Sequence, residues 1–329
     1  MKSYLLIRLS SLGDIVHAIP AFAALRRAET EARISWVVSP KGRPILELVT
    51  GLDEIIVVGE PGWKKRLRDR ERVALDFQGL IKSAWIGRLS GARRRLGFSR
   101  ANLREPMARL FYTEKAPLLS EDDHVILKNI RLLELLGLYD RTVSFPLAVP
   151  EGLIHGVEDR IKETGYVPGR ALAVLNVGAA WPTKRWLPER WVETLGKIDR
   201  SRLFPVLLWG TSEERRIASD IGRAAGVPLL PFLNVEETFA LFKKASLLVS
   251  GDTFALQAAC AVGLPVVALF GPTNPLRNGP FAPRDRVVYH ELPCGRCYRR
   301  SCPNPKCLEE IKADEVVRAI EEVRAGREE

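Results

Sequence analysis

Apolar and polar positions alternate along the first half of the chain in a strand–helix rhythm. Short apolar runs predict buried strands at residues 4–9, 34–38, 55–58 and 73–76. Helical spacing predicts a helix over residues 14–28, with apolar positions at Ile15, Ile19, Phe22 and Leu25. Further helices are predicted from near Pro44 and over residues 83–89. Regular alternation of this kind predicts a parallel α/β sheet.

The second half of the chain repeats the alternation. Strands are predicted at residues 171–177, 204–208, 247–250 and 266–270. Helices are predicted at residues 187–198, 212–222, 254–262 and 314–324. Residues 145–150 are extended and bounded by prolines, which marks a junction. The sequence therefore predicts two Rossmann-like α/β domains, residues 1–150 and residues 151–329.

Composition agrees with a folded globular protein. The chain has 329 residues, of which 46% are hydrophobic and 27% charged, and this excludes a disordered or collagen-like protein. The apolar run before Arg8 is too short for a signal peptide. The uncharged stretch 253–276 is interrupted by glycines and prolines, so we expect helix, turn and strand there and no membrane span.

Positive charge is concentrated in two segments of the first domain. Residues 64–72 contain six bases and two acids, and residues 88–109 contain seven bases and one acid. Together they account for the whole formal net charge of +10. Two solvated helix faces would explain them, but their concentration in one region favours a site for a multiply anionic ligand. The segments lack interleaved aromatic residues and any known nucleic-acid-binding motif, so a phosphorylated glycolipid fits as well as nucleic acid.

Three loops follow predicted strands, where ligands bind in open α/β sheets. In the first, residues 8–14, Gly13 permits a tight turn and Asp14 lies at or near a helix N-cap. Asp14 can be a simple cap, or a general base if a substrate hydroxyl comes within reach. In the second, residues 176–186, small residues precede the hydroxyl of Thr183 and the cations Lys184 and Arg185. These groups can bind phosphate oxygens. Its glycine–lysine spacing differs from a Walker A loop. The third comprises residues 250–253, followed by residues 263–265 and 270–274, many of which turn formation alone would explain.

The segments RLSSLGDIVHAIPA, DFQGLIKSA, the loop ending TKRW and SGDTFALQAACAVGLPVVALFGPTNP together resemble glycosyltransferase family 9. This family comprises the lipopolysaccharide heptosyltransferases, and the first two segments most resemble heptosyltransferase I. The resemblance implies a GT-B architecture, with two Rossmann-like domains facing across a cleft. It also implies an N-terminal acceptor domain and a C-terminal domain for an ADP-activated heptose. Transfer would invert the anomeric carbon and need no catalytic metal or other cofactor.

The resemblance also assigns roles to residues. It makes Asp14 the catalytic base, and Lys184 the cation that stabilises the leaving diphosphate. Glu213 or Glu214 falls near the position that holds the nucleotide ribose. The predicted donor-binding residues are Thr183, Lys184, Glu213, Glu214, Asp252, Thr253, Gly271 and Thr273. The predicted acceptor-binding residues are Ser11, Gly13, Lys64, Arg66, Gln78, Arg93 and Arg94.

The chain departs from the family pattern in one segment. The family commonly has Asp-Thr-Gly, with a histidine three residues after the glycine, where this chain has Phe254 and Gln257. A glycine lets a diphosphate approach the backbone closely, so Phe254 would narrow that approach. Gln257 donates a hydrogen bond but carries no charge. A family 9 transferase for another nucleotide-sugar is therefore an alternative, and a non-catalytic protein that binds anionic ligands or nucleic acid is a second.

Four of the five cysteines cluster near the C-terminus. Cys294, Cys297, Cys302 and Cys307 have the spacing C-x2-C-x4-C-x4-C. Without a signal peptide we expect a reducing compartment and no disulfide framework. Four thiolates can bind a structural Zn²⁺ tetrahedrally; an iron–sulfur cluster and four free thiols are the alternatives.

We thus predict an enzyme of lipopolysaccharide biosynthesis. Its partners would be an ADP-sugar donor, an anionic glycolipid acceptor such as Kdo-lipid A or heptosyl-Kdo-lipid A, and the membrane surface, without nucleic acid. It would be cytoplasmic and peripheral on the inner face of the inner membrane.

Overall fold

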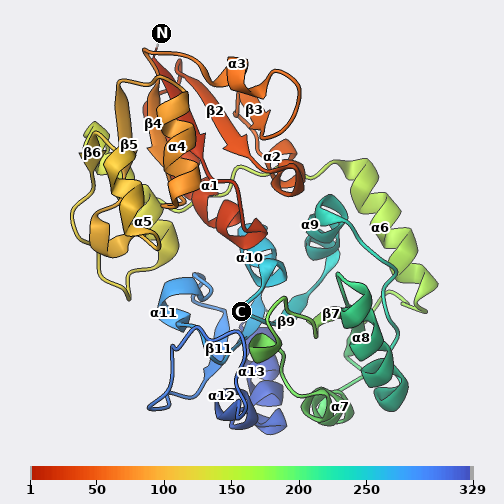
Figure 1. The fold of residues 1–329 in the computed structure, drawn as a ribbon. Helices are drawn as coiled ribbons and strands as arrows, with labels where there is room; N and C mark the ends of the chain where they lie inside the picture. Colours follow the sequence, from red (N-terminus) through yellow and green to blue (C-terminus); the bar gives the residue numbers. More distant parts are fainter. Residues whose placement is uncertain (1, 327–329) are drawn as a thin grey trace. The chain divides into compact units, whose positions relative to one another are not determined.

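The chain divides into two compact units, with the boundary between Ala148 and Val149 (Figure 1). This is a computed structural model, and it describes residues 2–326. Each unit contains one fully parallel sheet. No helix of the described residues is long and apolar enough to cross a membrane. The uncharged stretch 253–276 is distributed over two helices and the strand between them.

The first unit is built on a six-stranded sheet of order β3-β2-β1-β4-β5-β6. The strands are β1 (Ser3–Ile7), β2 (Arg33–Val38), β3 (Glu54–Val57), β4 (Val73–Asp76), β5 (Arg94–Gly97) and β6 (Glu114–Lys115). In the register, Ile7 at the end of β1 pairs with both Val37 and Asp76. The apolar runs predicted the first four strands. The pattern did not predict β5 and β6, because β5 opens on two arginines and β6 has only two residues.

Helices of the first unit connect these parallel strands. They are α1 (Leu12–Ala28), α2 (Arg43–Glu47), α3 (Trp63–Leu67), α4 (Ile81–Leu89) and α5 (Val125–Arg131), with 3-10 turns η1 (Pro40–Gly42), η2 (Arg100–Asn102), η3 (Pro106–Phe111) and η4 (Leu132–Leu136). The predicted apolar stripe of α1 is fully buried. Right-handed crossovers place α1 and α4 on opposite faces of the sheet, because the chain moves outward in opposite directions from β1 and β4 (Figure 1).

The second unit is built on a five-stranded sheet of order β11-β10-β9-β7-β8. The strands are β7 (Ala171–Asn176), β8 (Leu203–Leu208), β9 (Leu247–Gly251), β10 (Val266–Phe270) and β11 (Arg286–Tyr289). The helices are α6 (Glu151–Glu163), α7 (Pro188–Lys197), α8 (Ser212–Ala225), α9 (Val235–Lys244), α10 (Phe254–Ala261), α11 (Pro275–Asn278), α12 (Lys306–Glu309) and α13 (Ala313–Ala325), with the 3-10 turn η5 (Pro182–Lys184).

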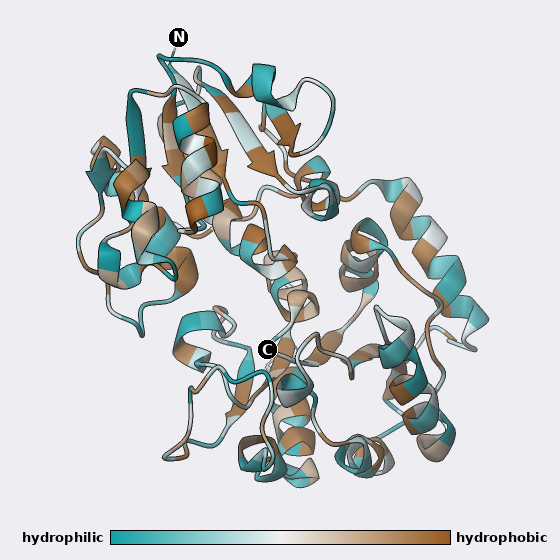
Figure 2. Cartoon of the chain, viewed as in Figure 1, coloured by the Kyte–Doolittle hydropathy of each residue, from teal (hydrophilic) through white to brown (hydrophobic). Residues whose placement is uncertain are grey.

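Hydrophobic residues predominate in the strands of both sheets, whereas α6 and α8 alternate between hydrophobic and hydrophilic positions (Figure 2). In the second unit Trp186 and Trp191 pack edge to face at 5.0 Å between the sheet and the outer helices. Burial of such rings stabilises a core by about 2–3 kcal/mol each. These rings therefore help to hold the outer helices of the second unit against its sheet.

Candidate functional site

The strand order of the first sheet identifies one place for a ligand. From β1 the chain moves to β2 and β3, and from β4 it moves the other way to β5, so the order reverses between β1 and β4. Open α/β sheets bind ligands at the carboxyl ends of the strands that flank such a reversal. Here the loop of residues 8–11 follows β1 and the loop of residues 77–80 follows β4.

Asp14 lies in the first turn of α1, beside this reversal. The N-cap is Ser11 and Asp14 is the third helical residue, so Asp14 lies near the N-cap, as predicted, and bonds back to it. The Ser11 amide and hydroxyl both donate to Asp14 Oδ2, at 3.1 and 2.8 Å. Arg8 Nη2 lies 2.8 Å from the same oxygen. The Asp14 side chain remains 34% exposed, so its carboxylate is held from one side and open on the other.

The surroundings of Asp14 control its protonation. Burial would by itself raise the pKa of this carboxyl, but Arg8, His17 and the two bonds from Ser11 hold the pKa well below its usual range. Arg8 is itself fixed, because its guanidinium donates to the Phe77 carbonyl and its side chain is only 11% exposed. Asp14 is therefore ionised at neutral pH and oriented.

The loop after β4 is organised by a buried carboxylate. Asp76 accepts hydrogen bonds from Tyr112 Oη (2.7 Å), Ser83 Oγ (2.8 Å) and the amides of Gln78 and Gly79. Burial raises the pKa of Asp76, and these donors oppose the rise. Gln78 Oε1 accepts from the Leu9 amide at 2.7 Å. The predicted acceptor residue Gln78 therefore joins the β4 loop to the Asp14 loop. The predicted acceptor residues Ser11 and Gly13 lie beside Asp14, at the N-cap and in the first turn of α1.

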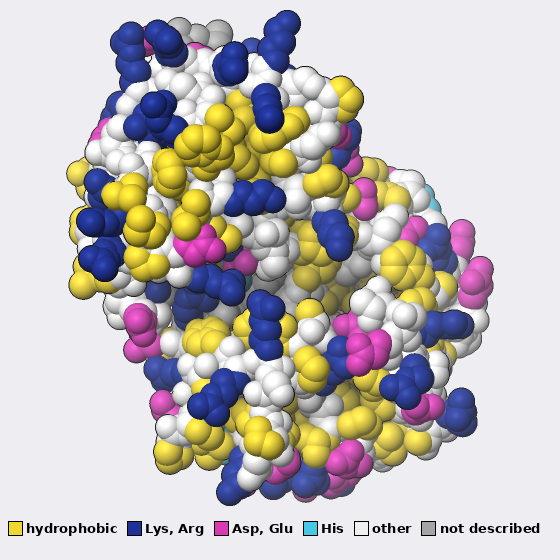
Figure 3. Space-filling view, in the orientation of Figure 1, with side chains coloured by type: hydrophobic (Ala, Val, Ile, Leu, Met, Phe, Trp, Pro, Cys, Tyr) yellow, Lys and Arg dark blue, Asp and Glu magenta, His cyan; other side chains and the backbone are white. Residues whose placement is uncertain are grey.

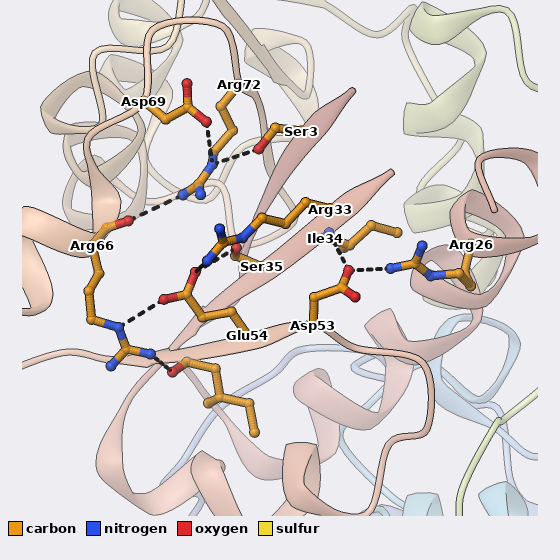
Figure 4. Close-up of polar contacts among 11 residues, drawn as sticks. Ser3, Arg26, Arg33, Ile34, Ser35, Asp53, Glu54, Arg66, Asp69 and Arg72 are labelled. Atoms are coloured by element: carbon orange, nitrogen blue, oxygen red, sulfur yellow. Dashed lines mark hydrogen bonds and ion pairs between the residues drawn. The ribbon is translucent and has the colours of Figure 1, made fainter. Parts of the chain in front are cut away.

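The predicted basic acceptor residues lie elsewhere in this unit. Arg66 pairs with Glu54 at 2.9 Å and donates to the Ile55 carbonyl, and Arg94 pairs with Glu114 at 2.7 Å. Figure 4 shows Arg66 and Glu54 in a cluster of ion pairs at the amino ends of the strands. Asp14 follows a carboxyl end, and all strands are parallel, so these residues belong to the opposite edge of the sheet.

Two other basic residues of the predicted set also lie away from Asp14. Arg93 directly precedes β5 and lies 3.6 Å from Glu71. Lys64 is exposed in α3, without a salt bridge among the described residues. The structure therefore does not gather Lys64, Arg66, Arg93 and Arg94 around Asp14. Long-range partners such as Glu54 and Glu114 gave no signal in the local sequence.

The second sheet has its own reversal, between β7 and β9. Asn176 ends β7 and pairs in register with Ser250 of β9. The Asn176 amide donates to Ser250 Oγ at 3.0 Å and to Thr253 Oγ1 at 3.1 Å. Thr253 is the N-cap of α10, so this network fixes a helix N-terminus at the reversal, where backbone amides favour an anion.

Lys184 and Asp252 meet at this point. Lys184 Nζ lies 2.6 Å from Asp252 Oδ2 and 3.1 Å from the Asp252 carbonyl. The ammonium also lies 4.5 Å from the centre of the Trp181 ring. The loop approaches the strand so closely that a side chain at Gly251 would lie 2.9 Å from the Lys184 carbonyl. Thr183 is buried and donates to the Arg299 carbonyl at 2.7 Å.

The two candidate ribose ligands have different surroundings. Glu214 Oε2 accepts from the amides of Gly210 and Thr211, and its carboxylate lies against Gly178, where a Cβ would come within 2.4 Å of it. Glu213 is exposed and paired with Arg185, and this pairing lowers the pKa of Glu213. Glu214 therefore lies between the carboxyl ends of β7 and β8, and Glu213 lies outside them.

The remaining predicted donor residues follow β10. Gly271 and Thr273 are both buried, and the Thr273 hydroxyl has no hydrogen-bond partner within residues 2–326. Phe254 packs edge to face on Phe239 at 5.9 Å. Gln257 donates to the Asn278 carbonyl at 2.9 Å. The two side chains that depart from the family pattern therefore pack against α9 and α11.

The cysteine-rich segment, residues 294–307, packs against these loops. The Tyr298 amide donates to the Pro272 carbonyl, and the Arg300 guanidinium lies 4.9 Å from the Trp181 ring centre. All five cysteines are free. Burial, together with the three neighbouring thiols, raises the pKa of Cys307.

Zinc binding by these thiols stays a prediction. Across residues 2–326, no group of three or more His, Cys, Asp or Glu side chains is arranged to hold a metal ion. Metal analysis of protein purified without a histidine tag tests the prediction.

Several residues of these sites had no role assigned to them by the sequence, although Arg8, Asn176 and Ser250 lie in the three loops singled out there. Arg8, Asn176, Ser250 and Arg300 act through partners distant in sequence, which only the fold brings together. A hollow of about 600 Å³ also lies beside the end of β8. It is lined in part by Trp209 and Phe232, whose ring centres lie 5.6 Å apart.

Comparisons with known proteins agree with one another. Residues 63–308 match the family model described as glycosyltransferase family 9 (heptosyltransferase). The chain is 28% identical over 319 residues to lipopolysaccharide heptosyltransferase 1 of Pseudomonas aeruginosa, covering 91% of this chain and 86% of the relative.

Solved structures show the same fold. A family 9 glycosyltransferase from Veillonella parvula has a TM-score of 0.81 at 20% identity, covering 98% of this chain and 97% of that one. The Escherichia coli heptosyltransferase WaaC with ADP-2-deoxy-2-fluoro heptose has a TM-score of 0.75 at 22% identity, covering 97% and 99%. These structures confirm the GT-B fold class.

Proposed function

This chain belongs to glycosyltransferase family 9 and is a glycosyltransferase, and on that premise we propose that it transfers heptose from ADP-L-glycero-D-manno-heptose to the lipopolysaccharide inner core. Transfer inverts the anomeric carbon and uses no metal ion. The observation that carries the proposal is the Lys184–Asp252 pair at the N-terminus of α10, beside the strand reversal of the second sheet.

The donor diphosphate binds in the second unit. Backbone amides at the start of α10 and the Lys184 ammonium offer positive charge where the leaving group gains negative charge. Incoming phosphate oxygens compete with Asp252 for Lys184. The E. coli relative holds an ADP-heptose analogue, which supports a donor of this class.

Glu214 holds the ribose of the donor. Its Oε2 is occupied by two backbone amides, and its second oxygen lies at Gly178, between the ends of β7 and β8. Carboxylate oxygens there accept hydrogen bonds from ribose hydroxyls. Glu213, neutralised by Arg185, is less suited to this role.

The acceptor binds in the first unit, and Asp14 is the base. The acceptor hydroxyl attacks the anomeric carbon, and its proton passes to Asp14 as the new C–O bond forms. The bond from the anomeric carbon to the phosphate oxygen breaks, and ADP leaves with the electron pair. Because attack and departure occur on opposite sides, the configuration inverts. The open side of the Asp14 carboxylate supports this role.

The acceptor is Kdo-lipid A or heptosyl-Kdo-lipid A, whose carboxylates and phosphates suit a chain of net charge +10. The relatives named lipopolysaccharide heptosyltransferase 1 support this class of acceptor. The protein would act at the inner face of the cytoplasmic membrane, where this lipid lies.

A second candidate is transfer from another nucleotide-sugar. Phe254 and Gln257 stand where the family commonly has glycine and histidine, and this favours a test of other donors. A non-catalytic role is set aside by family membership.

The test is ADP release from ADP-heptose in the presence of Kdo2-lipid A. We expect one ADP per heptose transferred, the same rate in excess EDTA, and an inverted anomeric proton by NMR. Release only from ADP-mannose or a UDP-sugar would favour the second candidate. Loss of the rate in EDTA, or a retained configuration, would contradict the mechanism.

A further inference from the structure

The outer face of α4 is apolar where a surface helix is normally polar. Ile81, Trp85 and Leu89, each four residues from the next, are all exposed, with Trp85 at 49%. Met107 and Leu110 of η3 are exposed at 59% and 63%. We call these five residues the α4–η3 surface. Figure 3 shows hydrophobic side chains gathered over α4, with Lys and Arg around them.

The two elements of the α4–η3 surface are packed on one another. The Trp85 ring meets Phe111 edge to face at 5.6 Å. Glu105 Oε2 accepts from the Ile81 amide at 2.7 Å and so caps α4 from the segment before η3. The exposed apolar side chains therefore stand on a fixed framework.

Basic side chains that form no ion pair within the described residues lie around this surface. Five basic residues lie on α4 or in the segment of η2 and η3, and none forms an ion pair in the described part of the chain: Lys82, Arg88, Arg100, Arg104 and Arg109. By contrast, Arg66 and Arg94 at the amino edge are paired with carboxylates. The unpaired cations are thus free to meet an external anion.

We propose that the α4–η3 surface docks on an anionic membrane. Exposed Trp, Leu, Ile and Met side chains suit the headgroup–acyl boundary, and surrounding Lys and Arg suit anionic headgroups. A second copy of this chain fits less well, because a symmetric contact would bring the five unpaired cations of each copy against those of the other. An anionic lipid membrane is therefore the partner that we propose for this surface.

This inference rests on the proposed function for its purpose. α4 begins three residues after Gln78, which is bonded to the Asp14 loop. Docking through the α4–η3 surface therefore brings the carboxyl edge of the first sheet to the membrane surface. A lipid-anchored sugar acceptor lies there, so membrane binding and acceptor binding would use adjacent parts of one unit.

Vesicle co-sedimentation of the full chain tests the docking. We expect binding to phosphatidylcholine vesicles with 30% phosphatidylglycerol, weak binding to pure phosphatidylcholine, and a loss of binding as salt rises. Met107→Ser/Leu110→Ser, and separately Arg104→Ala/Arg109→Ala, should each weaken binding by about tenfold or more. Matched controls are Val167→Ser, at a residue whose exposure of 61% is close to that of Met107 and Leu110, and Lys243→Ala/Arg318→Ala, which removes the same charge as the arginine pair. Both should bind like the wild type.

An activity measurement separates this inference from the proposed function. Met107→Ser/Leu110→Ser should keep the wild-type rate on a de-acylated, water-soluble acceptor and lose rate on acceptor embedded in vesicles. Equal vesicle binding by wild type and both surface variants would overturn the docking. The docking would also be overturned if a surface variant no longer self-associated in sedimentation velocity but still bound vesicles like the wild type. Absence of transfer by the wild type, with vesicle binding intact, would overturn only the proposed function.

Discussion

Asp14 and Arg8 form an ion pair in which the arginine controls the protonation of the carboxylate. A general base works best when its pKa is near the working pH, yet Arg8 and its neighbours hold the pKa of Asp14 well below its usual range. Arg8 thus keeps the Asp14 carboxylate ionised and fixes its orientation, but it makes the carboxylate a weaker base. In the proposed mechanism Arg8 is therefore a positioning residue that acts through Asp14.

The pH profile tests this coupling. Arg8→Met removes the positive charge that offsets the effect of burial and favours the ionised carboxylate, so the pKa of Asp14 rises. Asp14 is then protonated at higher pH, and the acid limb of kcat/KM should move upward by about one pH unit or more. A purely structural role would lower activity evenly across pH.

The matched control is Arg27→Met, in the same helix. Arg27 pairs with Asp140 at 2.7 Å, away from Asp14, so its loss should leave the profile in place. An unmoved acid limb in Arg8→Met would contradict the account.

At the scale of elements, the cysteine-rich segment supports the donor loop. Thr183 donates to the Arg299 carbonyl, and the Trp181 ring contacts both the Lys184 and the Arg300 cation, at 4.5 and 4.9 Å from its centre. Residues 298–300 therefore hold the loop that presents Lys184. Nothing in the local sequence of either segment indicates this contact.

Arg300→Ala should raise the donor KM by about three- to tenfold while kcat changes little, because a cation–π contact contributes about 1 kcal/mol. Steady-state kinetics with varied donor measure it. Arg299→Ala is the matched control, since only the backbone carbonyl of Arg299 is used. A KM equally raised in both variants would point to a general charge effect and against the loop contact.

The same scale shows how far sequence reasoning reached. Strands formed by unbroken apolar runs could be predicted from the sequence. Because the local pattern of apolar residues also shows where such a strand ends, the loops after β1, β7 and β9 could be predicted as well. Acceptor binding by Arg66 and Arg94 stays a prediction, and the structure adds that each is paired with a carboxylate distant in sequence, Glu54 of β3 and Glu114 of β6. The sequence shows where basic residues are concentrated, but only the fold shows which of them already form salt bridges with carboxylates.

On the scale of the whole molecule, each unit carries one strand reversal with its own chemistry. The first has an ionised, partly exposed carboxylate, and the second has a lysine at a helix N-terminus. The central claim is that the two reversals divide the work, with proton removal in the first unit and diphosphate binding in the second.

The most direct test measures ADP affinity by calorimetry and turnover by ADP release, in Asp14→Asn and Lys184→Met. Asp14→Asn should keep ADP affinity within about twofold while kcat falls at least about 100-fold, because an amide cannot take the proton. Lys184→Met should weaken ADP binding itself. Wild-type turnover in Asp14→Asn, or unchanged ADP affinity in Lys184→Met, would contradict the division.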